Sequence, residues 1–248
     1  MSVFLDSGTA ESRFVGNLAT LLGEDGPRMP RLVAAAEAVS RDPQGFVCWL
    51  ASLTRDAEAV RAVVARSYWH PNGFAKLVLH TSAVSEFKIR MHVWPESAAS
   101  VRGEMNPHSH RWDFASTLLT GQGMVMPEYR EVADEGDLFT RYRYGIDEVN
   151  PATLVFDGAV RLVQVKPRHL SRGSVYSCDT HVIHTAEPLG RDLTATVVVQ
   201  GPHRVPTTAV FCAPGQSEDQ PNRALSVADF RLLVKAVISG VGGCGSLQ

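Results

Sequence analysis

The stretch that decides the fold is "NPHSHRWDFASTLLTG", residues 106–121, in which two histidines stand two residues apart at the head of an apolar run. In an extended strand, residues i and i+2 project from the same face. The sequence therefore predicts that His108 and His110 point in one direction, with Trp112 and Phe114 following on that face. Two imidazoles in this arrangement can chelate one transition-metal ion.

The regions around this stretch indicate two kinds of structure. The first 70 residues contain apolar runs at helical spacing, with Asp42 and Asp56 as expected N-caps. A further amphipathic helix is expected from Ser226, as its cap, to Gly240, as its stop. The chain is therefore expected to begin and end in helices.

Between these helices, the sequence predicts a β-barrel or sandwich. From "HPNG" at 70–73 to about residue 212, short β-type runs alternate with clusters of Gly, Pro, Asp and Asn. The segment 122–172 is long for a connection and predicts an extra hairpin over the barrel mouth. The expected organisation has three parts: an N-terminal helical segment packed on the barrel at 1–70, the barrel at 71–215, and a C-terminal helix and tail at 216–248.

A second stretch, "GSVYSCDTHVIHTAEP" at 173–188, completes a pattern that begins with the two histidines. Together the two stretches resemble the motifs of the cupin superfamily, in which HxH is followed by a glutamate and a glycine and the second motif ends in a histidine. Gly121 and His184 stand where that pattern requires them. The resemblance covers about residues 74–212 and implies a mainly β fold, a cupin barrel of the jelly-roll type.

Two departures from the cupin pattern affect the metal site. Phe114 occupies the usual glutamate position, and His181 occupies an inner glycine position of the second motif. The implied metal ligands are three neutral histidines: His108, His110 and His184. His181 is a rival third ligand or a catalytic group, and Asp113 would join only if a bulge turned it inward. Histidines lining a barrel without metal are the remaining alternative.

A three-histidine cupin resembles the thiol dioxygenases, the group that includes cysteine dioxygenase and uses Fe(II) to add O2 to a thiol. The resemblance implies a basic residue on an earlier strand that holds the substrate carboxylate, with Lys76 as first choice and Arg90 as second. Trp112 and Phe114 would form an apolar wall that keeps the reaction dry.

The match to the animal-type enzyme is incomplete. The cysteine that follows HxH in that enzyme is absent, and the strand "TATVVVQG" lacks its tyrosine, which Tyr142 or Tyr144 would have to replace. Asp179 or Glu187 is expected to orient a ligating imidazole. These differences indicate a more specialised substrate than free cysteine.

The leading hypothesis is thus a mononuclear non-haem Fe(II) oxygenase or oxidase that uses O2 on a small amino-acid-like or thiol metabolite. The alternatives are a non-oxidative isomerase, lyase or cyclase, in which Zn, Ni or Mn acts as a Lewis acid, and a ligand-binding cupin without turnover.

The composition is that of an ordinary globular protein, with 248 residues, 44% hydrophobic and 20% charged. A formal net charge of -2 gives no reason to expect nucleic acid or a membrane as partner. The chain starts without a secretory signal pattern, and its four scattered cysteines favour a reducing, cytoplasmic setting. Barrel edges with an added helical layer leave a homodimer open.

Overall fold

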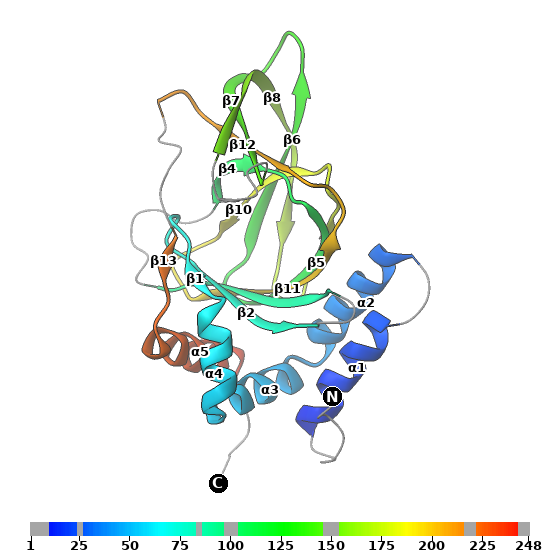
Figure 1. Cartoon of the computed structure of the whole chain (residues 1–248), viewed down its shortest axis with the longest axis vertical. Coiled ribbons are helices and arrows are strands. Elements are labelled where there is room, and N and C mark those ends of the chain that lie inside the picture. Colours follow the sequence, from blue (N-terminus) through cyan, green and yellow to red (C-terminus); the bar gives the residue numbers. More distant parts are fainter. Residues whose placement is uncertain are drawn as a thin grey trace.

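The computed structural model describes residues 10–23, 27–82, 86–96, 104–145, 154–215 and 222–242. It has three layers, in which helices cover one face of a sheet and a second sheet lies on the other face (Figure 1). The helices are α1 Ala10–Gly23, α2 Arg28–Arg41, α3 Pro43–Arg55, α4 Ala57–Ala65 and α5 Val227–Val241.

The first sheet has the strand order β13-β1-β2-β3-β11-β5-β9, and its described strands pair antiparallel. Its strands are β1 Tyr68–Trp69, β2 Ala75–Thr81, β3 Lys88–Trp94, β5 Trp112–Thr120, β9 Val175–Cys178, β11 Thr194–His203 and β13 Arg223–Ala224.

The second sheet closes on itself in the order β10-β4-β12-β7-β8-β6. Its strands are β4 Glu104–His108, β6 Met124–Val132, β7 Asp137–Tyr144, β8 Leu154–Leu170, β10 Ile183–Pro188 and β12 Thr208–Cys212. The expected fold class, mainly β with N-terminal helices and a C-terminal helix, is confirmed.

Local signals account for the helices, with two corrections. The Asp42 side chain accepts a hydrogen bond from the Gly45 amide at 2.8 Å, and Asp56 caps α4, both as expected. The helical prediction was wrong at its end, because residues 68–69 form β1. The predicted end of the C-terminal helix was also wrong, because α5 runs past Gly240 to Val241 and is capped by Gly242, whose φ of 112° is left-handed.

The two faces of the first sheet pack against different layers. On β5, Ala115 and Leu119 join the core beneath the helices, whereas Phe114 and Leu118 join a second apolar cluster between the sheets. This alternation follows from the two-residue period of a strand. Gly121 ends β5 at a φ of 116°, and a Cβ there would lie 2.6 Å from the Thr194 Oγ1, so glycine is required at this turn.

The segment between the two motifs forms β6, β7 and β8. These three strands lie at the end of the molecule opposite the helices, where β8 pairs with both β6 and β7 (Figure 1). Strand β1 pairs with β13, so parts of both terminal segments extend the first sheet. Among the described residues, no helix is long and apolar enough to cross a membrane.

Candidate metal centre

Three histidines from distant parts of the chain meet between the two sheets. The ring-nitrogen ligand atoms of His108, His110 and His184 all lie within 4.8 Å of one another. Their ring centroids are 4.9 Å apart for His108 with His110, 4.9 Å for His108 with His184, and 5.1 Å for His110 with His184. Metal–imidazole distances of about 2.1 Å bring donor nitrogens to within roughly 4 Å of one another, so small rotations let these rings share one ion.

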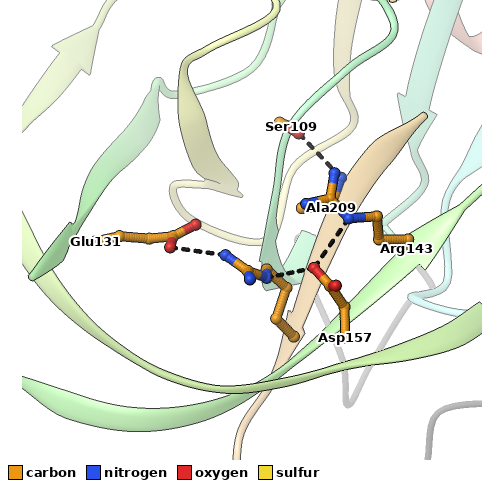
Figure 2. A network of polar contacts seen from close by, with 6 residues as sticks. Ser109, Glu131, Arg143, Asp157 and Ala209 are labelled. Carbon is orange, nitrogen blue, oxygen red and sulfur yellow. Dashed lines mark hydrogen bonds and ion pairs between the residues drawn. The ribbon is translucent and has the colours of Figure 1, made fainter. Parts of the chain in front are cut away.

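The first two histidines do not lie in one strand, which corrects the sequence prediction. Strand β4 ends at His108, and His110 lies in the short connection before β5. Ser109 between them is fixed to β12, where its amide donates to the Ala209 carbonyl at 3.0 Å and its Oγ accepts from the Ala209 amide at 3.1 Å (Figure 2). The Thr208 hydroxyl donates to the Ser109 carbonyl. This anchoring turns both histidines toward one point.

The third histidine is brought in by strand pairing. His184 on β10 lies directly opposite His108 on β4, and it is only 2% exposed. The Nδ1 of His108 is 3.0 Å from the carbonyl oxygen of Asn106. A carbonyl can only accept, so this Nδ1 carries the proton and the Nε2 is the nitrogen left for a metal.

Aromatic side chains pack against these imidazoles. The Phe114 ring meets the His110 ring edge-on at 5.0 Å and lies 5.9 Å from the His184 ring, with 4% of the residue exposed. The Trp112 ring is 5.5 Å from the His110 ring. Phe114 thus fills space beside the histidines with apolar surface at the position where a cupin usually carries a glutamate.

Asp113 faces away from the three histidines. It is 2% exposed, and its carboxylate accepts from Arg204 at 2.9 Å and lies 4.0 Å from Arg28 at the start of α2. The pairing of β5 with β11 is irregular beside Asp113, between Gln200 and His203, but this irregularity does not turn the carboxylate toward the histidines. The alternative of Asp113 as a ligand was therefore wrong.

Three other predicted site residues lie apart from the histidine cluster. His181 is exposed in the turn before β10, where its amide donates to Asp179. Lys76 lies on β2, one strand farther from β5 than Arg90 on β3, and its ammonium is 5.2 Å from the centroid of the Phe74 ring. Tyr142 is buried on β7, with β12 between it and His108. The roles assigned to these three residues stay predictions.

Arg90 lies much closer to the site. Its guanidinium carbon is 5.0 Å from the centroid of the Trp112 ring, which in turn contacts His110. Burial lowers the pKa of Arg90, while Tyr68 and Tyr144 act weakly in the opposite direction. Among the described residues, no carboxylate is paired with this guanidinium, and its buried Nε has no hydrogen-bond partner.

Three further basic side chains surround Arg90, and we call Lys88, Arg90, Arg111 and His203 the basic cluster. The His203 ring stacks on Trp112 at 5.3 Å and 17°. Burial lowers the pKa of Lys88, and the charges of Arg90 and Arg111 lower it further. Burial also lowers the pKa of His203, again assisted by the three cations, and the carboxylate of Glu86 opposes the shift in both residues.

The sequence did not reveal two polar groups next to the histidines. The Asn106 carbonyl orients His108, a role expected of Asp179 or Glu187. Glu128 on β6 lies directly opposite His184 in the second sheet and is ion-paired with Arg168. Met124 and Met126 precede Glu128 at the two-residue period, which indicates its face, but nothing in the sequence indicates that β6 lies beside β10.

Among the described residues, no cysteine joins the three histidines. Cys178 lies opposite Phe114 in the sheet pairing, and burial raises the pKa of its thiol to about 12. A neutral buried thiol is a poor metal ligand. Cys212 is also free, whereas Cys48 on α3 is disulfide-bonded, which the scattered spacing of the cysteines did not predict.

No protein-family model matches the chain, and no curated protein matches it in sequence. Among solved structures, it is similar to a cupin domain from Bordetella pertussis Tohama I, with 13% identity and a TM-score of 0.31 over 54% of this chain and 97% of that one. It is also similar to an oxalate oxidase, with 14% identity and a TM-score of 0.34 over 69% of this chain and 75% of that one. For the 11S globulin procruciferin from Brassica napus, the identity is 12% and the TM-score 0.34 over 55% of this chain and 28% of that one. Similarities at this level carry no functional argument, so the case for function rests on the histidines.

Proposed function

We propose that this chain is a metal-dependent oxygenase or oxidase that uses O2 on a small amino-acid-like or thiol metabolite, with a mononuclear non-haem Fe(II) held by His108, His110 and His184. The observation that carries the proposal is the mutual approach of the three ligand nitrogens to within 4.8 Å. Imidazole is a suitable ligand for Fe(II), and a set of three leaves coordination positions free for substrate and O2.

When bound, the iron would supply the redox chemistry, and the protein's own residues would bind the substrate and keep water out. Phe114 and Trp112 cover the histidines with apolar surface, which lowers the local dielectric and excludes water. Arg90, beside Trp112, is the cation best placed to hold the anionic end of a substrate whose reacting group lies at the metal. The Asn106 carbonyl accepts from the His108 Nδ1 and so orients the ring with its Nε2 left for the metal.

The test is metal analysis of anaerobically purified protein, followed by O2-uptake assays over amino acids and thiols. We expect one iron per chain in the wild type and its loss in His184→Ala, because removing one of three ligands weakens binding by orders of magnitude. The matched control is His181→Ala, since His181 is exposed and outside the cluster. Equal iron content in the two variants would refute the ligand assignment, and iron without O2 uptake would refute the oxidative function.

A second function uses the same donor set. Three neutral imidazoles also suit Zn, Ni or Mn, which would act as a Lewis acid in an isomerase, lyase or cyclase reaction. The same metal analysis separates the two, because stoichiometric Zn, Ni or Mn in place of iron, with no O2 consumption, favours this alternative.

A further inference from the structure

The basic cluster has more positive charge than its surroundings balance. Lys88 and Arg90 alternate on β3 with Ile89 and Met91, whose side chains pack in the core under the helices. By the two-residue period, the two cations therefore face the space between the sheets, on the same side as the histidines.

The third cation and the histidine reach this place from neighbouring backbone. The Arg111 carbonyl accepts from the Arg204 amide at 2.7 Å, which fixes the residue after His110 to the end of β11, where His203 lies. The Arg111 guanidinium carbon is 5.9 Å from the centroid of the Tyr144 ring. The cluster is thus held together by backbone contacts and aromatic rings.

The positive charges of the basic cluster outnumber the negative charges that act on it. Three cationic side chains, Lys88, Arg90 and Arg111, act on His203, and the carboxylate that acts on Lys88 and His203 among the described residues is the exposed Glu86. Two positive charges are left over. A buried guanidinium without an anionic partner is costly, so its retention beside a candidate metal centre indicates a ligand that supplies the missing charge.

We propose that the basic cluster binds the dianionic part of the substrate, a phosphoryl group or a pair of carboxylates, while the reacting end of the same molecule lies at the three histidines. The proposal rests on the proposed function only in taking the ligand to be the substrate. Trp112 links the two subsites, because its ring contacts both His110 and Arg90. A substrate with one carboxylate, such as a simple amino acid, would leave the cluster half neutralised.

The test measures anion binding to metal-free protein by calorimetry at constant ionic strength, so it does not depend on turnover. The probes are succinate, inorganic phosphate and, as a monoanion of similar size to succinate, butyrate. We expect succinate or phosphate to bind at least about tenfold more tightly than butyrate, as charge-assisted hydrogen bonds to a second anionic group imply. Whichever dianion binds more tightly identifies the group as two carboxylates or as a phosphoryl.

Variants locate the binding. Arg90→Gln should weaken dianion binding about tenfold or more, Lys88→Gln and Arg111→Gln less, and Arg231→Gln, at an exposed position on α5, not at all. His184→Ala should keep dianion binding even where it loses metal, which separates this proposal from the proposed function. Thermal unfolding shows whether each variant is folded. If Arg90→Gln does not fold, the dianion affinities of Lys88→Gln and Arg111→Gln test the proposal in its place. Equal affinity for butyrate and the dianions, or binding unchanged in the cluster variants, would overturn the proposal.

Discussion

Two groups of arginines in this molecule have opposite surroundings. On the strands β6, β7 and β8, Arg141 donates to Glu131 at 2.8 Å and forms an ion pair with Asp157 at 2.7 Å, and Arg143 donates to Asp157 at 2.9 Å (Figure 2). In the basic cluster, Arg90 is half-buried with a fully buried Nε, and no carboxylate is paired to it among the described residues. The first group is charge-balanced within the chain, and the second is not.

The difference teaches how to separate stabilising charges from functional ones. An internally paired charge is satisfied whether or not a ligand is present, so its removal costs stability. An unpaired buried charge lowers the stability of the free protein, and its removal relieves that cost. Unfolding free energies of single variants should therefore change in opposite directions in the two groups.

The largest effect is expected for the most buried balanced charge, Asp113. Asp113→Asn removes the anion that accepts from Arg204 and lies near Arg28, and it should lower the unfolding free energy by about 2 kcal/mol. The cost stays moderate because both arginines are partly exposed and regain water. Urea unfolding measures it, with Asp134→Asn in the exposed β6–β7 turn as control. A loss no larger than that of the control would mean that the Asp113 pairs contribute nothing.

The opposite sign is expected at Arg90. Arg90→Met keeps much of the side-chain volume and removes the buried cation, so the unfolding free energy should rise by about 1 kcal/mol. The matched variant Arg141→Met breaks two ion pairs and should lower it. Both are measured by urea unfolding of metal-free protein. If Arg90→Met lowers the unfolding free energy as much as Arg141→Met does, the Arg90 charge is compensated within the chain. The two groups of arginines would then not differ in the way proposed.

A smaller loss is expected at the centre of the balanced group. Asp157→Asn leaves Arg141 and Arg143 without their shared negative charge and should cost about 0.5–1 kcal/mol, a modest value because these side chains are partly exposed. The loss should shrink in 0.5 M NaCl, since salt screens exposed pairs. Unfolding at low and high salt tests this, and a loss independent of salt would assign it to packing instead.

The sequence predicted most of the barrel because its signals were local. Turn residues separated the apolar runs that form β2, β3 and β5, and Asp42 and Asp56 correctly predicted the N-termini of α3 and α4. The sequence did not predict β4, because Pro107 and its polar neighbours are unfavourable in a strand. Pairing with β10 and β12, far along the chain, overrides that preference.

The candidate site shows the same difference between what local sequence patterns predict and what depends on contacts between distant strands. The three histidines could be predicted because two motif spacings fix them, and the structure brings them together. The charge state of their surroundings could not be predicted. Glu128 becomes relevant only when β6 pairs with β10, and Arg111 joins the cluster only because β11 ends beside it. Both depend on contacts between strands, which local patterns do not specify.

The smallest effect is expected at His203, and it depends on pH. Burial and the neighbouring cations lower the pKa of His203 from its ordinary value of 6.5. The unfolded chain therefore binds this proton more readily, so the residue costs stability as the pH falls through 6.5 and costs nothing where it is neutral in both states. Because the His203 imidazole is mostly exposed and solvent screens its interactions, the effect should be small. His203→Gln should be more stable than the wild type by at most a few tenths of a kcal/mol at about pH 5.5 and equal to it at about pH 8.

The control for this prediction is His169→Gln, at an exposed position on β8, which should show no such gain. Succinate or phosphate adds a further check, because a dianion in the basic cluster would offset the three cations and raise the pKa of His203 toward its ordinary value. The pH-dependent gain of His203→Gln should then shrink when the dianion is present. A gain that does not change with the dianion would mean that the anion binds away from the basic cluster.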